Sequence, residues 1–205
     1  MAPRAYNNET RQQQQAELKE RIAAAAARLH AAQGGLATRY AEIAQAAGVS
    51  LPTVYKHFPD LDALMGACTG HVGAQAPAFP AAQILAAGDL AEAVVRLVKA
   101  ADRLNAFFEP WLVWREEERI PLLGQLAAEQ RQQLTGFIES LLAQHDVDQA
   151  HTLAPAWDAV LHFEFWHRLV RQHKLSRPAT REIQQQLLLA VSGPRRPAPT
   201  TTRPT

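Results

Sequence analysis

The sequence predicts a fold that is entirely α-helical. Residues that favour helices, chiefly Ala, Leu, Gln, Glu and Arg, dominate the chain. Val and Ile rarely alternate with polar residues, and no Asn-Gly pair marks a β-hairpin. Strands are therefore expected nowhere in the chain.

Length and composition indicate a protein with a substantial core. The chain has 205 residues, of which 47% are hydrophobic. Its one cysteine, Cys68, excludes an internal disulfide framework and thiolate metal clusters. The N-terminus lacks the apolar core of a signal peptide, and no apolar run could span a bilayer. We expect a soluble, cytoplasmic protein.

The first half of the chain predicts four helices. Apolar residues recur at helical spacing over about residues 18–29, and the Gly34-Gly35 pair should end this first helix. A second helix is expected over about residues 39–47, with Thr38 as its N-cap. A third should cover 51–57, capped by Ser50, and a fourth about 61–74.

Longer helices are expected in the second half. Asp89 with Glu92 resembles a capping box that opens a helix to about residue 108, and Pro121 should open one that reaches residue 144. Pro155 lies near the start of a helix that should end at about 173, and Pro178 opens a last helix to 191. The predicted organisation is a flexible arm (1–12), a first domain (13–74), a second domain (75–192) and a disordered tail (193–205).

Residues 41–58, AEIAQAAGVSLPTVYKHF, form the most informative segment. Gly48 can adopt the positive φ of a tight turn between two helices. The apolar side chains on both sides of that turn are spaced to face one core, namely Ile43, Ala44, Ala47, Val49, Val54 and Phe58. The outward residues of the second helix are Leu51, Thr53, Tyr55, Lys56 and His57, which are able to contact base edges and phosphates.

These residues resemble the signature of the TetR family of helix-turn-helix repressors. The matching positions are Thr38, Ile43, Ala44, Ala47, Gly48, Val49, Ser50, Thr53, Tyr55, His57 and Phe58. The resemblance covers about residues 14–70. It implies an all-α protein with an N-terminal three-helix, homeodomain-like domain and a C-terminal helical domain for ligand binding and dimerisation.

The resemblance also implies which residues contact DNA. The helix over 51–57 would enter the major groove, with Thr53 and Lys56 at bases or backbone and Tyr55 and His57 at phosphates. The expected DNA-contact set is Thr38, Arg39, Leu51, Pro52, Thr53, Tyr55, Lys56 and His57. Many members carry Lys where this chain has Leu61, so one phosphate contact is absent or supplied elsewhere. Through Phe58, seven Lys or Arg residues stand against four Glu, a basic bias that suits DNA.

The second half is rich in aromatic residues, which are usually core but can also line a cavity. The candidates for contact with a largely apolar or aromatic small-molecule effector are Phe107, Trp111, Trp114, Phe137, Trp157 and His162.

The last two long helices correspond to the dimer interface of the family. The expected seam is Leu161, Phe165, Leu169, Ile183, Leu187 and Ala190. A homodimer would bind a near-palindromic operator on double-stranded DNA and be released from it by the effector.

Other functions fit the sequence less well. His162, Glu164 and His167 do not form a metal site on a continuous helix, because offsets of two and five point to different faces. No phosphate loop, nucleophile elbow or paired cysteines indicate an enzyme, so no catalytic residue, cofactor or metal is expected. The run Glu116 to Glu118 is interpreted as a solvated helical face that could border a pocket. A three-helix unit that never touches DNA and a regulator of the same fold controlled by a protein partner are the remaining alternatives.

Overall fold

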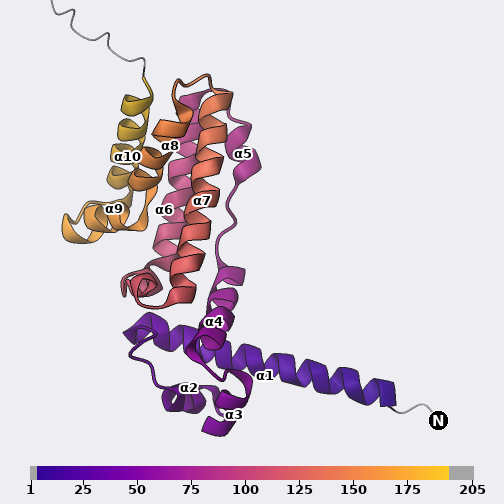
Figure 1. Ribbon diagram of the computed structural model, residues 1–205. Helices are drawn as coiled ribbons and strands as arrows, with labels where there is room; N and C mark the ends of the chain where they lie inside the picture. Colours follow the sequence, from indigo (N-terminus) through magenta and orange to yellow (C-terminus); the bar gives the residue numbers. More distant parts are fainter. Residues whose placement is uncertain (1–3, 194–205) are drawn as a thin grey trace, which may run out of the picture. The chain divides into compact units, whose positions relative to one another are not determined.

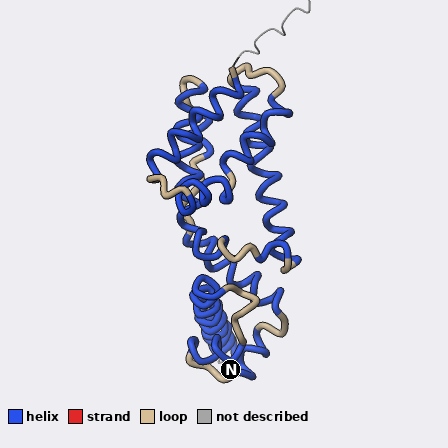
Figure 2. Tube along the Cα trace, turned by 90° about the vertical axis from the view of Figure 1, so that its left-hand side faces the viewer, coloured by secondary structure: helices blue, strands red, loops and turns tan. Residues whose placement is uncertain are grey.

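The computed structural model describes residues 4–193, and within this range it contains helices and no strand (Figure 2). The chain divides into two compact units that are not contiguous in sequence: residues up to 78 with 103–132, and residues 79–102 with those from 133 onward. The segment 75–192, predicted as one domain, therefore contributes to both units. The predicted disordered tail, 193–205, lies outside the described residues except for Gly193.

Unit 1 is built on four helices, α1 (Arg4–Gln33), α2 (Tyr40–Ala47), α3 (Leu51–His57) and α4 (Leu61–Gln75) (Figure 1). Small side chains on α1 let α2 and α4 approach closely, and α3 packs against α2. Their shared core consists of Ile22, Ala25, Ala26, Ile43, Ala44, Ala47, Val54, Phe58 and Leu64. The helices meet in the way that the apolar pattern of residues 18–58 predicts.

Unit 1 also includes the end of α6 (Leu90–Leu112), the short 3-10 helix η1 (Glu116–Glu118) and the start of α7 (Pro121–Gln144). Phe107, Phe108 and Trp111 of α6 pack against Ala27 on α1 and against α4. This apolar contact explains why residues so far along the chain belong to the N-terminal unit.

Unit 2 contains α5 (Ala81–Leu85), the first part of α6, the rest of α7, α8 (Ala150–Leu161), α9 (Phe163–His167), the π-helical segment η2 (Arg168–Gln172) and α10 (Arg177–Ser192). Its core combines α6, α7, α8 and α10 around Leu97, Leu141, Trp157 and Leu188, all of which are fully buried. No helix within residues 4–193 has both the length and the apolar character that crossing a membrane requires.

Several helix boundaries differ from the sequence predictions. Helix α1 begins at Arg4, within the segment 1–12 predicted as a flexible arm, because the Gln-rich segment before Leu18 has good helix propensity although it lacks an apolar stripe. Helix α6 continues through Pro110 to Leu112, and α5 has no counterpart among the predicted helices. The boundaries predicted for α3 and α7 are confirmed.

The helix predicted from Pro155 to about residue 173 is wrong. His162 has extended backbone angles, φ −61° and ψ 148°, and separates α8 from α9. The break turns Phe163 and Trp166 inward, where both are buried. On a continuous helix these two residues would not share the face of Trp157 and Leu161, which lie four positions apart. Burial of two aromatic side chains therefore outweighs local helix continuity.

Candidate nucleic-acid interface

The turn between α2 and α3 has the conformation that its glycine predicts. Gly48 has φ 66° and ψ 39°, in the left-handed region, and its N–H donates to the carbonyl of Gln45 at 3.2 Å. The N–H of Val49 donates to Ala44 at 3.0 Å, so the end of α2 is closed by two bonds. Ser50 then starts α3, and its hydroxyl accepts from the N–H of Thr53 at 3.3 Å.

Helix α3 buries one side and presents the other to solvent. Val54 is fully buried, whereas Leu51 is 38% and Tyr55 50% exposed. Pro52 and Lys56 are exposed, and Thr53 and His57 are half-buried. The hydroxyl of Thr53 lies 2.7 Å from that of Ser50, so these two side chains share a hydrogen bond at the start of the helix. The predicted DNA-contact residues of α3 thus lie together on one short helix.

Tyr40, which sequence reasoning did not select, supports Tyr55. The two rings have centroids 4.7 Å apart, and the hydroxyl of Tyr40 donates to the carbonyl of Asp60 at 2.6 Å. Asp60 is the N-cap of α4 and accepts from Ala63 at 2.8 Å. Burial raises the pKa of Tyr40, and the charge of Asp60 acts in the same direction. Tyr40 therefore links the starts of α2 and α4 to the exposed ring of α3.

Thr38 and Arg39 lie at the start of α2, but Thr38 is not its N-cap. The hydroxyl of Thr38 donates to the carbonyl of Gly34 at 2.6 Å and accepts from the side chain of Gln33. Arg39 occupies the N-cap position, and the Glu42 carboxylate accepts from its backbone N–H at 2.7 Å. The predicted cap at Thr38 is wrong because its hydroxyl closes the preceding turn instead. The exposed side chain of Arg39 remains on the surface beside α2.

A polar pair is buried between α1 and α4. Nδ1 of His30 lies 3.4 Å from the sulfur of Cys68, and Nε2 of His30 has no hydrogen-bond partner among the described residues. Burial lowers the pKa of His30, although the charge of Glu116 opposes this effect. Burial raises the pKa of the Cys68 thiol to about 12. Cys68 is therefore a neutral, buried residue, as a lone cysteine in a helical core is expected to be.

The predicted effector residues are divided between the two units. Phe107 and Trp111 pack on unit 1, and the indole N–H groups of Trp111 and Trp114 donate to carbonyls of α1. The other three belong to unit 2. There, Phe137 lies edge-on to Phe79 at 5.2 Å between centroids, and Trp157 is fully buried with its N–H bonded to Ser192. His162 is exposed, and its ring accepts from the N–H of Glu164 at 3.4 Å, so it caps α9 instead of lying on a helical face as a metal ligand would.

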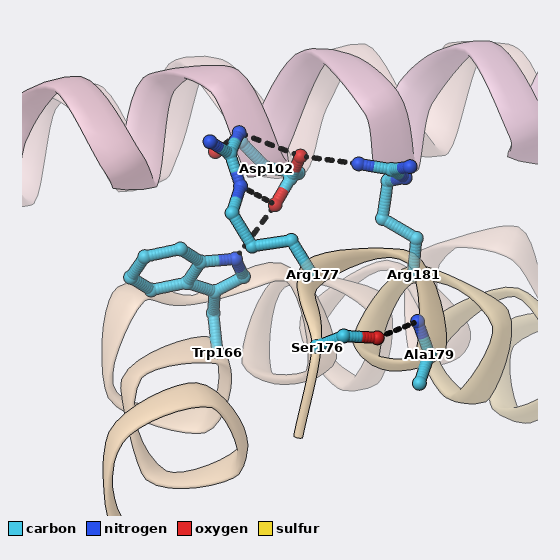
Figure 3. Close-up of polar contacts among 6 residues, drawn as sticks. All are labelled: Asp102, Trp166, Ser176, Arg177, Ala179 and Arg181. Carbon is cyan, nitrogen blue, oxygen red and sulfur yellow. Dashed lines mark hydrogen bonds and ion pairs between the residues drawn. The ribbon is translucent and has the colours of Figure 1, made fainter. Parts of the chain in front are cut away.

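Unit 2 contains a buried carboxylate that sequence reasoning did not single out. Asp102 on α6 is 1% exposed and accepts hydrogen bonds from the side chains of Trp166, Arg177 and Arg181 at 2.8 to 3.0 Å (Figure 3). Burial alone would raise the pKa of Asp102, but the bonds from Arg177, Trp166 and Arg181 together hold it below its usual value. This group, which we call the Asp102 cluster, ties α6 to α9 and α10. A polar residue in the middle of an amphipathic helix is the only sequence signal that could have suggested it.

The predicted dimer residues have different degrees of exposure. Leu161 is 3% exposed and belongs to the core of unit 2. Phe165, Leu169 and Ile183 are half-buried, and Leu187 and Ala190 are exposed. Leu189 and Val191 add further exposed apolar surface at the end of α10.

The geometry of α2, the Gly48 turn and α3 defines a helix-turn-helix protein. Residues 22–68 match the family model described as bacterial regulatory proteins, tetR family. No curated protein gives a significant match to the sequence.

Solved structures resemble the chain over most of its length. A proposed transcriptional regulator from Saccharomonospora viridis, in complex with choline, is 25% identical with a TM-score of 0.67 over 85% of this chain and 96% of its own. A transcriptional regulator from Rhodococcus sp. RHA1 is 18% identical, with a TM-score of 0.63 over 85% of this chain and 97% of its own. The multidrug binding protein EbrR, complexed with imidazole, is 22% identical, with a TM-score of 0.62 over 90% and 93%.

The match identifies residues 22–68 as the helix-turn-helix DNA-binding domain of a TetR-family transcriptional regulator. This family consists of regulators and not of enzymes, which decides against the alternative of a helical enzyme.

Proposed function

We propose that this regulator is a repressor that binds a near-palindromic operator as a homodimer and is released by a small, largely apolar or aromatic effector. The observation that carries the proposal is the exposed side of α3, where Tyr55 and Lys56 stand on a helix held rigidly by the Gly48 turn and the Ser50 cap. Such a helix can enter the major groove, while Arg39 at the start of α2 can reach a flanking phosphate.

Tyr55 is the residue whose role can be tested most sharply. Its ring packs against that of Tyr40 at a tilt of 31°, so a Tyr55→Phe variant keeps that contact and removes only the hydroxyl. If the hydroxyl binds a phosphate, the variant binds operator several-fold more weakly, because such a hydrogen bond contributes roughly 1 kcal/mol. Lys56→Ala should weaken binding to all sequences and lower the slope of log affinity against log salt by about 1 for each phosphate that the lysine neutralises in the wild type.

The experiment measures the affinity of the purified protein for the DNA next to its own gene over a range of salt concentrations. Lys99→Ala is the matched control, because Lys99 is also exposed but lies on α6 in unit 2. Specific binding that weakens in the Tyr55 and Lys56 variants, with Lys99→Ala unchanged, supports the proposal. Weak binding without sequence preference, equal in all variants, contradicts it.

The dimer is proposed to form through α10. Leu187 and Val191, four positions apart on α10, form exposed apolar surface at its end, of a kind that self-association would cover. Leu187→Arg should convert the dimer to a monomer in light-scattering measurements and abolish tight operator binding. Val95→Arg on α6 changes another exposed apolar residue, 46% exposed against 39% for Leu187, and should leave the dimer intact. A Leu187→Arg protein that remains dimeric would exclude this seam.

The effector is proposed to act in unit 2, where Phe137 and Trp157 remain the candidate contacts. The neighbours solved with choline and imidazole support a small organic molecule as the ligand class. By population shift, a ligand that prefers the DNA-free arrangement would lower the operator-bound fraction. A ligand screen by tryptophan fluorescence, followed by release of bound operator, tests this part. If a co-purifying protein, and not a small molecule, releases the bound operator, the regulator is controlled by a protein partner. A cytoplasmic location follows from this role and remains a prediction.

A further inference from the structure

The C-terminal end of α1 is held by residues that lie about eighty positions later in the sequence. The carboxylate of Glu116 accepts hydrogen bonds from the backbone N–H groups of Gly35 at 2.7 Å and Leu36 at 2.8 Å, using one oxygen for each. Hydrogen bonds from backbone N–H groups to an ionised carboxylate are stronger than those between neutral groups. Glu116 therefore closes the segment between α1 and α2 in one defined conformation.

Two tryptophans extend the same contact along α1. The indole N–H of Trp114 donates to the carbonyl of Ala31 at 3.3 Å, and that of Trp111 donates to Ala27 at 2.9 Å. Ala31 is within the last four residues of α1, whose carbonyls have no partner inside the helix. We call Trp111, Trp114 and Glu116 the α1 clamp.

The Gly34-Gly35 pair fits the clamp closely. Gly34 has φ 84°, a left-handed conformation, and a Cβ atom there would lie 3.0 Å from a Glu116 oxygen and 3.3 Å from the Trp114 ring. A Cβ atom at Gly35 would lie 2.9 Å from the other Glu116 oxygen. The glycines thus serve not only to end α1 but also to admit the clamp.

The turn held by the clamp leads directly to candidate DNA contacts. The Thr38 hydroxyl donates to the carbonyl of Gly34, and Arg39 caps α2 one residue later. Arg115, immediately before Glu116, has φ 53°, a conformation that costs a residue other than glycine about 1 kcal/mol or more. The hydrogen bonds of Glu116 to Gly35 and Leu36 therefore form although the backbone at Arg115 is in an unfavourable conformation.

We infer that Glu116 is a positioning residue for DNA binding, which acts through the Gly34 to Thr38 turn to place Arg39 against the DNA backbone. The inference rests on the proposed function. Of the clamp residues, Trp111 lies in the last turn of α6, whereas Trp114 and Glu116 follow the end of that helix.

The test uses the full-length protein and a duplex that the wild type selects from a random-sequence DNA library. Glu116→Gln keeps the size of the side chain but cannot accept both N–H groups with a charged oxygen. Glu118→Gln on the same 3-10 helix is the matched control, because Glu118 is exposed. Glu116→Asp, which keeps the charge but shortens the reach, provides a second variant should the glutamine variant fail to fold.

Glu116→Gln should bind the selected duplex about tenfold more weakly at fixed salt. The slope of log affinity against log salt should fall by about 0.9 for each phosphate that the variant no longer neutralises. Ethylation interference should disappear at the flanking phosphates while protection of bases by α3 persists. Arg39→Ala should have the same effects, and the double variant should bind no more weakly than Arg39→Ala alone. Glu116→Asp should show a smaller effect of the same kind, and Glu118→Gln none.

Two outcomes would overturn the inference, and a third would overturn the proposed function on which it rests. A Glu116→Gln protein that melts earlier but retains the wild-type salt slope and phosphate contacts would show a merely structural role and overturn the inference. Additive effects of Glu116→Gln and Arg39→Ala would also overturn it, because Glu116 would then act elsewhere. If the wild type selects no sequence from the library, the proposed function itself fails, and this result is distinct from the other two.

Discussion

Replacing Asp102 with asparagine should destabilise unit 2 severely, although the two side chains have the same shape. Asp102 is 1% exposed and accepts four side-chain hydrogen bonds, two from Arg177 and one each from Arg181 and Trp166. The asparagine amide would turn an N–H group toward donors, and the arginines would lose their counter-charge. Breaking a buried ion pair by removing one partner costs about 3–5 kcal/mol.

The two arginines bring the expected value toward the lower end of this range. Their side chains are 43% and 31% exposed, so water can replace part of the original interaction. The single asparagine oxygen can serve either the two donors on Oδ1 or the two donors on Oδ2, so one of these two sets loses its acceptor. We expect Asp102→Asn to lower the free energy of unfolding by about 3 kcal/mol.

Urea denaturation followed by circular dichroism measures this loss, and Glu139→Ala serves as the control because Glu139 is an exposed carboxylate in the same unit. The pKa of Asp102 lies below its unfolded value, so its contribution is present above about pH 4 and is lost as the pH falls through the folded pKa. Asp102→Asn should therefore lack that acid-dependent loss. A change below about 1 kcal/mol in Asp102→Asn would refute the view that the Asp102 cluster holds α6 to α9 and α10.

Two further predictions concern unit 1. Gly48→Ala should lower the free energy of unfolding by about 1–2 kcal/mol from backbone strain alone, since φ is 66° and an added Cβ would meet nothing within 4 Å. Thermal unfolding measures this loss, and Gly70→Ala is the control because Gly70 is a helical glycine in open space. A melting temperature of Gly48→Ala equal to that of the wild type would contradict the prediction. His30 has a lowered pKa, so the unfolded chain takes up a proton first and stability should fall below about pH 6.5, by up to about 1.4 kcal/mol per pH unit. Melting curves of wild type and His30→Gln between neutral and mildly acidic pH test this, and an equal slope in both proteins would assign the pH dependence to other groups.

Local chemistry was sufficient to predict the helix-turn-helix from the sequence. The Gly48 turn, the Ser50 cap and the spacing of Ile43, Val54 and Phe58 act within less than twenty residues, and the structure has each of them as expected. Interactions of this range depend on residue type and helical periodicity, which can be read without knowing the rest of the fold.

Tertiary contacts decided the features that the sequence did not reveal. His162 ends a helix because Phe163 and Trp166 are buried by distant segments, and Glu116 binds a turn about eighty residues away instead of facing solvent. Leu161, with the spacing of a seam residue, is part of the core. Periodicity shows that a helix has an apolar face but not which neighbour covers that face, since this depends on how the whole chain packs. The sequence by itself therefore determined the class of protein and its helix-turn-helix, whereas only the tertiary structure decided the α1 clamp, the Asp102 cluster and the exposed apolar residues of α10.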